Sequence, residues 1–274
     1  MAKRSAGMLW PMPTLMETPV QPRRSDPARW LADILRAEIE QRAGSDREGL
    51  LPSEQDLASR FGATRNVVRD ALDLLRKEGL VRRVPGAGTF ACGGRAVHGL
   101  DRLRGLAETF HEEPDRVANR VLAAAVVPAQ DLVAERLEIE PGTPVVFIER
   151  LRSLDGRPLS LDASYLPAEL ATPLLGPAPY DLGTSVLARR DVFALLEQTI
   201  GVRLGLATLS IEAVSADPAT AQLLEVASGA ALLLVNRLAR LVDGRPVDLE
   251  FVRYRGDRLS LTAWLSRDGE GSDG

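Results

Sequence analysis

The chain has 274 residues, of which 45% are hydrophobic, and it carries a formal net charge of -4. This length and apolar content are enough to bury a core and favour two domains over one. The charge is unevenly distributed: the residues up to Arg95 include 16 basic and 12 acidic side chains, and the remainder includes 18 basic and 26 acidic ones. A mildly basic N-terminal part in front of an acidic body fits a nucleic-acid contact made by one end only.

Cysteine content and hydropathy exclude a disulfide-stabilised protein and a protein that spans a membrane. The single cysteine, Cys92, cannot form an intramolecular disulfide, and no apolar run is long enough to span a membrane. Residues 1–22 lack the basic start and the continuous apolar run of a signal peptide. We therefore expect a cytoplasmic protein with a disordered tail at residues 1–22 and a second at residues 268–274.

The first elements in chain order are three helices. Apolar residues at three- and four-residue spacing predict an amphipathic helix at 27–43. The cap residue Ser53 opens a short second helix that stops at Gly62, and Thr64 caps a third helix that ends at Gly79. The helices are followed by a predicted hairpin, with short strands at 80–83 and 89–91 around a Gly- and Pro-rich turn. Three helices and a hairpin, with a glycine turn between helices two and three, are typical of a winged helix-turn-helix.

The Gly-rich stretch 92–99 is interpreted as a linker between the domains. Beyond it, the order helix, strand, Asp-Gly turn, strand occurs twice, and Asp-Gly between apolar runs is a strong hairpin signal. The first copy has its helix from Pro128 and its strands at 145–151 and 159–166; the second has its helix from Pro218 and its strands at 232–241 and 247–254. This pattern predicts an α+β domain in which two related halves build one antiparallel sheet.

Two stretches resemble known families. The run LPSEQDLASRFGATRNVVRDALDLLRKEGLVRR at 51–83, with GAGTF at 86–90, resembles the DNA-binding domain of the GntR family. The region 100–267 resembles the UTRA sensing domain, whose fold is similar to chorismate lyase. The matching motifs are IERLR (148–152), DGRPLSL (155–161), SYLP (164–167), ALLE (194–197), IEAVSADP (211–218) and YRGD (254–257). The resemblance implies the HutC-like branch of the GntR family, with a DNA-binding domain at 23–91 and an effector-binding and dimerisation domain at 100–267.

The start of the third helix holds the main candidate DNA-binding residues, because that end enters the major groove in such motifs. Arg65 can pair with guanine, Asn66 with adenine or a phosphate, and Arg69 with a second guanine or the backbone. Thr64 and Ser53, at helix starts, suit phosphates.

The hairpin supplies further candidates, since the resemblance implies that Arg82, Arg83 and Gly86 of the wing reach the DNA backbone or minor groove. Gln55 stands where the family often has a DNA-contacting arginine, so this contact is expected to be weaker or altered. An isolated surface arginine is usually only solvated, and it is the ordered set of residues that favours DNA binding.

The resemblance also implies an effector cleft between sheet and helices. The implied contacts are Arg150, Arg152, Asp191, Phe193, Asp248 and Tyr254. Asp191 and Phe193 replace a serine and a tyrosine that members binding phosphorylated sugars tend to have, and a carboxylate there disfavours a phosphate. Asp162 and Glu250 occupy matching places on the two return strands and join the candidate set. The alternative that Arg150, Asp162 and Glu250 pair only with one another, and that Tyr165 and Tyr254 are core aromatics, stays open.

An enzyme is the main rival interpretation, but no nucleophile has a plausible base. Cys92 lies in the linker, and His98 and His111 lack metal-ligand spacing, so we expect no catalytic residue, no metal and no cofactor. Neither lysine, Lys3 or Lys77, lies in the sensing region, which excludes a Schiff-base sensor. A DNA-binding protein without effector is the third alternative, and ligand-induced release from DNA distinguishes it.

The sequence thus predicts a homodimeric, non-membrane transcriptional regulator. It would bind a palindromic double-stranded operator, act by default as a repressor, and respond to a small-molecule effector of unidentified structure with the 92–99 linker as hinge. Activation remains the alternative direction of control.

Overall fold

The computed structural model describes residues 26–42, 49–92, 95–109, 116–175, 186–188 and 190–265. The chain divides into two compact units between Ala96 and Val97. The two predicted tails and His111 lie outside the described residues.

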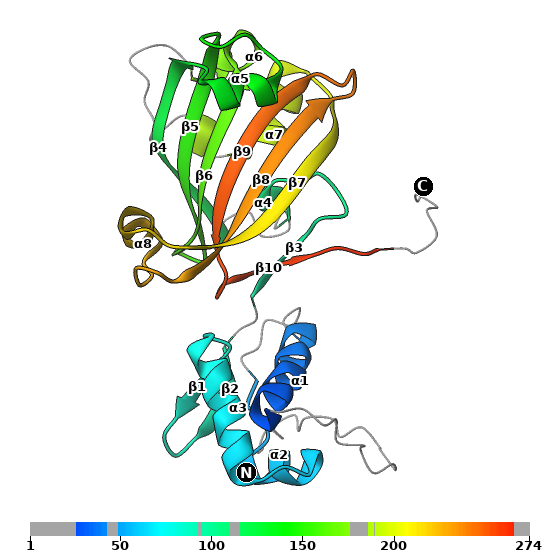
Figure 1. The fold of residues 1–274 in the computed structure, drawn as a ribbon, viewed down its shortest axis with the longest axis vertical. Coiled ribbons are helices and arrows are strands. Elements are labelled where there is room, and N and C mark those ends of the chain that lie inside the picture. Colours follow the sequence, from blue (N-terminus) through cyan, green and yellow to red (C-terminus); the bar gives the residue numbers. More distant parts are fainter. Residues whose placement is uncertain are drawn as a thin grey trace, which may run out of the picture. The chain divides into compact units, whose positions relative to one another are not determined.

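The first unit has the predicted winged helix-turn-helix (Figure 1). Its elements are α1 (Pro27–Arg42), α2 (Glu54–Phe61), α3 (Arg65–Lys77), β1 (Val81–Val84) and β2 (Gly88–Ala91). The apolar faces of the helices meet in one core, in which Leu31, Leu57, Val68 and Leu75 are fully buried. The strands β1 and β2 pair antiparallel and form the wing.

Capping residues fix the turn between α2 and α3. Ser53 and Asp56 form a capping box at the start of α2, in which each side chain accepts a backbone N–H of the other residue. The helix ends at Gly62, whose φ of 60° lies in the left-handed region that glycine adopts without strain. Thr64 then caps α3, so the chain reverses within a few residues and α3 begins with its polar side chains exposed.

A six-stranded antiparallel sheet dominates the second unit, in the order β4-β5-β6-β9-β8-β7 (Figure 1). The strands are β4 (Val117–Pro128), β5 (Pro144–Leu154), β6 (Arg157–Pro167), β7 (Leu204–Ser215), β8 (Ala231–Leu241) and β9 (Pro246–Arg255). The helices are α4 (Leu106–Thr109), α5 (Asp131–Leu137), α6 (Ala168–Ala171), α7 (Val192–Leu195) and α8 (Pro218–Leu224). The predicted α+β class and antiparallel sheet are confirmed.

The internal repeat is visible in this topology. The unit α5-β5-β6 is followed later in the chain by α8-β8-β9, and the return strands β6 and β9 pair at the centre of the sheet. Both repeat helices end on a glutamate in the left-handed region, Glu138 at φ 57° and Glu225 at φ 54°. Equivalent residues of the two halves therefore come close together at the middle of one sheet.

The two faces of the sheet are covered differently. One face packs against α6, α7 and two short 3-10 turns (Thr172–Leu175 and Val186–Ala188) in the largest apolar cluster. The other face has two separate clusters, one under α5 and one under α8. The buried charges described below lie on the first of these faces.

Part of the predicted linker is a strand. Residues Ala96–Gly99 form β3, which pairs with β10 (Leu259–Thr262), and the Leu100 N–H donates to the Thr262 carbonyl at 2.7 Å. The glycines of this stretch suggested a flexible segment, but backbone pairing with a distant strand satisfies its hydrogen bonds instead.

Candidate DNA-binding surface and effector site

The start of α3 separates a buried face from an exposed one. Val68, on the buried face, is fully inaccessible, whereas Arg65, Asn66 and Arg69 are exposed, as the sequence predicted. Thr64 accepts the N–H of Val67 at 3.4 Å and so uses its hydroxyl to cap the helix. The three exposed side chains stand next to the helix N-terminus, where backbone N–H groups and the helix dipole favour an anion.

Gln55 lies beside this group. The Nη2 of Arg65 donates to Oε1 of Gln55 at 3.1 Å, which links α2 to the start of α3. In place of the arginine that the family resemblance led us to expect, the chain thus has an acceptor that orients Arg65. Both side chains are exposed, so the bond is open to exchange for a base or a phosphate.

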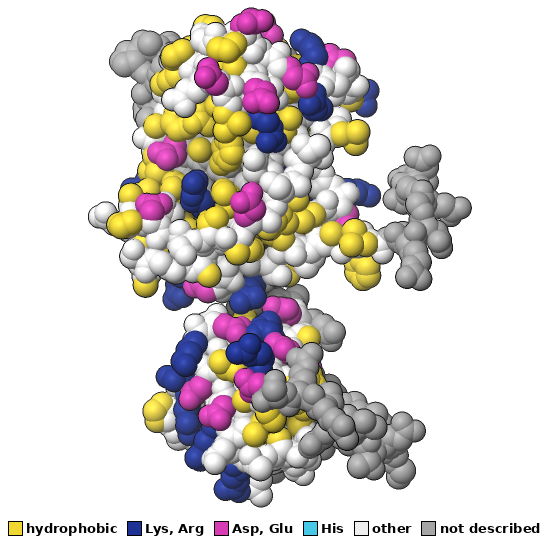
Figure 2. Space-filling view, in the orientation of Figure 1, with side chains coloured by type: hydrophobic (Ala, Val, Ile, Leu, Met, Phe, Trp, Pro, Cys, Tyr) yellow, Lys and Arg dark blue, Asp and Glu magenta, His cyan; other side chains and the backbone are white. Residues whose placement is uncertain are grey.

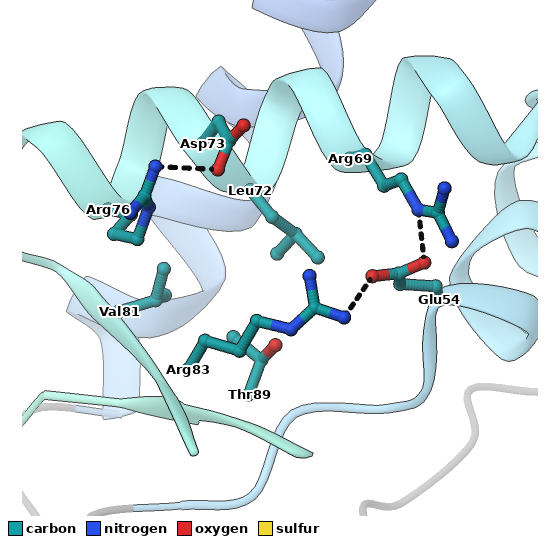
Figure 3. Close-up of a pocket in the computed structure, with 8 residues that line it drawn as sticks. All are labelled: Glu54, Arg69, Leu72, Asp73, Arg76, Val81, Arg83 and Thr89. Atoms are coloured by element: carbon teal, nitrogen blue, oxygen red, sulfur yellow. Dashed lines mark hydrogen bonds and ion pairs between the residues drawn. The ribbon is translucent and has the colours of Figure 1, made fainter. Parts of the chain in front are cut away.

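Sequence reasoning missed Glu54, which joins α3 to the wing. Figure 3 shows its carboxylate between Arg69 and Arg83, in a hollow lined also by Leu72, Asp73, Arg76, Val81 and Thr89. Glu54 accepts from Nε of Arg69 at 2.8 Å, and its other oxygen lies 3.5 Å from Nη2 of Arg83. This hydrogen bond raises the pKa of Arg69. The acid at the first position of α2 therefore holds one arginine from α3 and one from the wing.

The wing presents the remaining candidates. The Arg82 guanidinium stands 5.1 Å from the centre of the Phe90 ring, a cation–π contact across the hairpin, and Arg82 and Arg83 are both exposed. Gly86, at φ 76°, forms the hairpin tip, where nothing lies within 4 Å of an added Cβ. The predicted DNA-binding residues thus occupy the start of α3, the adjoining start of α2 and the wing of one unit.

The eight predicted effector-binding residues are all buried in the second unit, each at most 5% exposed. Arg150 and Arg152 come from β5, Asp162 from β6, and Asp248, Glu250 and Tyr254 from β9. The start of α7 adds Asp191 and Phe193. Strand alternation places the six strand residues on the face that α6 and α7 cover.

Arg152 is the centre of this cluster. It pairs with Asp162, donates from Nη1 to Oδ1 of Asp191 at 2.7 Å, and has Nη2 at 3.8 Å from Oε1 of Glu250. Its pKa is raised: burial acts to lower it, but the charges of the three carboxylates outweigh burial. A guanidinium with three buried acidic neighbours is firmly charged and held in one orientation.

Arg150 is less well satisfied. Its Nη1 donates to the Arg190 carbonyl at 3.2 Å, but Nη2 lies 3.8 Å from Asp162 and has no hydrogen-bond partner among the described residues. Burial, reinforced by the nearby charge of Arg152, lowers the pKa of Arg150. The structure thus leaves a buried donor next to the arginine that organises the cluster.

Sequence reasoning missed Arg237 on β8. Arg237 pairs with Glu250, and its guanidinium stacks 4.4 Å from the centre of the Phe193 ring. The internal repeat contains the signal that could have found it: the cross-strand pair Arg237 and Glu250 in the second half corresponds to Arg150 and Asp162 in the first. Each half thus contributes one arginine and one acid to the centre of the sheet.

Asp248 differs from the other acids. Its Oδ1 is buried and has no hydrogen-bond partner within the described part of the chain. Burial, together with the charge of the nearby Glu250, raises the pKa of Asp248 to about 8. Burial also raises the pKa of Tyr254. At neutral pH Asp248 is mostly a neutral acid, able to donate as well as accept a hydrogen bond.

The segment that follows β3 is bonded to this cluster. The Glu108 N–H donates to Oδ2 of Asp191 at 3.1 Å, and Nη1 of Arg237 donates to the Arg104 carbonyl at 3.4 Å. His98, on β3, shares a 2.8 Å hydrogen bond with the Thr109 hydroxyl. Burial, and then the charges of Arg237 and Arg152, lower the pKa of His98 to about 4.

Comparison with known proteins identifies both units. Residues 28–91 match the bacterial regulatory proteins of the gntR family, and residues 112–260 match the UTRA domain. The chain is 32% identical over 234 residues to an uncharacterized HTH-type transcriptional regulator, RB1450, of Rhizobium meliloti, covering 85% of this chain and 92% of the relative. The chain belongs to the GntR family of bacterial transcriptional regulators. It is a DNA-binding regulator with a UTRA domain, not an enzyme.

Other relatives of this GntR-family chain carry compatible names. It is 26% identical to the HTH-type transcriptional repressor NagR of Bacillus subtilis over 79% of this chain and 86% of the relative. The crystal structure of PhnF from Mycobacterium smegmatis matches 85% of this chain and 99% of its own, with a TM-score of 0.59 and 24% identity, and so shares the fold.

The described residues contain no group of three or more His, Cys, Asp or Glu side chains placed to hold a metal ion. They also contain no helix that is long and apolar enough to cross a membrane.

Proposed function

We propose that the protein is a cytoplasmic repressor of the HutC-like branch that binds a palindromic operator as a homodimer and leaves it when an effector binds the UTRA domain. The observation that carries this proposal is the bond between the buried charge cluster and the segment that leads to the DNA-binding unit. Recognition of the operator rests on Arg65, oriented by Gln55 and flanked by Asn66 and Arg69.

The buried cluster is the proposed effector site. It combines three arginines with four carboxylates, and at least two of its polar groups, on Arg150 and Asp248, have no hydrogen-bond partner within the described residues. Groups of this kind are costly to bury and are usually satisfied by water or a ligand. A polar small molecule with both donors and acceptors suits them, and the carboxylate of Asp191 disfavours a phosphate at its position.

Asp191 supports control of DNA binding by this site. One of its oxygens accepts from Arg152, within the cluster, and the other accepts from the Glu108 backbone, on the segment after β3. An effector that binds Arg152 competes with Asp191 for the Arg152 guanidinium. Displacement of the Asp191 carboxylate then changes its hydrogen bond with the Glu108 N–H. Since residues 95–99 lead directly into this segment, the change reaches the connection to the DNA-binding unit.

The test is release of the full-length protein from labelled DNA taken from upstream of its own gene, using a panel of sugars, amino sugars and amino acids. A compound that releases wild type should need about tenfold more to release Asp191→Asn, which keeps the shape but loses the charge-assisted bond to Arg152. The matched control is Asp217→Asn, at the exposed cap of α8, where asparagine caps equally well. Equal release of all three proteins would contradict the proposed site.

A further inference from the structure

The second face of the sheet is open between α5 and α8. Along β5, Val146 and Ile148 are buried while Phe147 and Glu149 are only half-buried, and β6 and β9 alternate in the same way. Successive residues of a strand point to opposite faces, so the half-buried residues share the second face. They are Phe147 and Glu149 on β5, Ala163 and Tyr165 on β6, Phe251 and Arg253 on β9, and Leu234 and Asn236 on β8. We call this set the open face.

The open face is largely aromatic and aliphatic. The rings of Phe147 and Tyr165 have their centres 5.1 Å apart, and the Phe251 ring lies edge-on to Tyr165 at 6.4 Å. On the adjoining α5, Leu132 is 58% exposed. Figure 2 shows hydrophobic side chains gathered in patches on the surface of the sheet unit. Contiguous exposed apolar surface with aromatic residues is characteristic of protein interfaces.

Two charges of opposite sign stand on the open face. Glu149 is in the row of residues that includes Ala163 and Phe251, and Arg253 is in the next row on the same face, two strands away. Strand spacing and rise separate the two positions by roughly 12 Å, too far for an ion pair. Neither side chain forms an ion pair or a hydrogen bond with another residue in the described ranges.

We propose that a second copy of the chain covers the open face, with Glu149 of each copy paired with Arg253 of the other. This inference rests on the proposed homodimer and assigns its surface. In a two-fold interface a patch meets itself, and an axis that lies in the interface midway between Glu149 and Arg253 sets each residue opposite the other residue of the partner copy. One acid and one base without partners, held apart on an apolar face, form two reciprocal ion pairs by this rotation.

The free-energy cost of burying unpaired charges also favours a second copy as the occupant. An apolar partner would bury both charges without compensation, which is costly, whereas a second copy neutralises both. Charge complementarity of this kind also fixes register and discourages other partners. The small residue Ala163 lies between the two strands that carry the charges and leaves room for close approach at the axis.

The test is the dimer dissociation constant of the full-length protein, measured by sedimentation of wild type, Glu149→Arg, Arg253→Glu and the double variant. Each single variant places like charges opposite each other and should weaken the dimer about tenfold or more, while the double variant restores the pairs and should return to within about threefold of wild type. Restoration separates the effect from misfolding. Glu169→Arg, an equal charge change at an exposed position on α6, which covers the opposite face of the sheet, is the control and should leave the dimer unchanged.

A monomeric wild type at micromolar concentration, single variants that remain dimeric, or a double variant that is not restored would each overturn the assignment. Operator binding by the same proteins separates this result from the proposed function. A dimer that follows the charge-swap pattern but binds all DNA alike contradicts the proposed repressor only. A specific DNA binder whose dimer ignores the charge swap contradicts the assigned face only.

Discussion

Replacing Asp248 by asparagine should stabilise the protein in a pH-dependent way. The pKa of this buried carboxyl is about 8, against about 3.9 for an ordinary aspartate. Between these values the folded protein holds a proton that the unfolded chain has lost, so stability falls as the pH rises from about 4 to about 8 and then levels off. The asparagine side chain is neutral throughout this range, so the substitution removes the loss.

The full difference between the two pKa values corresponds to about 5–6 kcal/mol. Movement of the neighbouring Arg237 and Glu250 reduces it, so we expect Asp248→Asn to be more stable than wild type at pH 8 by about 1–3 kcal/mol, the usual cost of an unsatisfied buried polar group. The advantage should shrink towards zero near pH 4.5.

Urea unfolding of the full-length protein between pH 4.5 and 9, followed by circular dichroism of the sheet, measures this. Asp131→Asn, at the exposed first residue of α5, is the control and should give the wild-type pH profile. An Asp248→Asn protein that is less stable than wild type at pH 8, or that keeps the wild-type slope, would refute the reasoning. It would mean that Asp248 is ionised and well paired in the folded state.

Three further substitutions test separate contacts. Glu54→Gln should free the two arginines that Glu54 holds, so binding to an unrelated duplex should tighten a few-fold and become more salt-dependent in fluorescence anisotropy, whereas unchanged binding would count against a restraining role. His98→Gln should remove a stability loss of up to about 3 kcal/mol that wild type shows as the pH falls from about 6.5 towards 4, because folded His98 stays neutral; parallel urea profiles of the two proteins would contradict this. Gly105→Ala would place a Cβ 2.3 Å from the Asp191 carboxylate and should cost about 1–3 kcal/mol by calorimetry, whereas Gly256→Ala meets only ordinary contacts; equal losses would contradict the packing.

The elements with strong local signals were predictable from the sequence. Ser53, Gly62 and Thr64 mark helix ends by their own chemistry, and the two Asp-Gly hairpins identify the central strands of the sheet. The edge strands β4 and β7 were not predicted. β4 has an alanine-rich middle, and alanine is depleted in strands, so only pairing with β5 makes this segment extended.

The candidate sites were predictable to different extents. The exposed residues at the start of α3 follow from a single amphipathic helix. The roles of Glu54 and Arg237 depend on partners from other elements, and cross-strand register decides which charges meet. The family resemblance indicated an effector cleft between the sheet and the helices, and the structure adds that those residues are buried in a network of ion pairs. These residues are buried because the helices and the segment after β3 pack over this face of the sheet. Such packing joins segments far apart in the chain, so no local sequence pattern predicts it.

The most direct test of the account is fluorescence anisotropy with two duplexes, one from upstream of the protein's own gene and one unrelated, using wild type, Arg65→Ala and Arg76→Ala. Arg76 is an exposed arginine at the other end of the same helix and serves as the matched control. We predict that wild type and Arg76→Ala prefer the upstream duplex and that Arg65→Ala loses about tenfold to a hundredfold of that affinity, with little change on the unrelated duplex. Equal, salt-sensitive binding of wild type to both duplexes, or full specificity in Arg65→Ala, would contradict recognition by the start of α3.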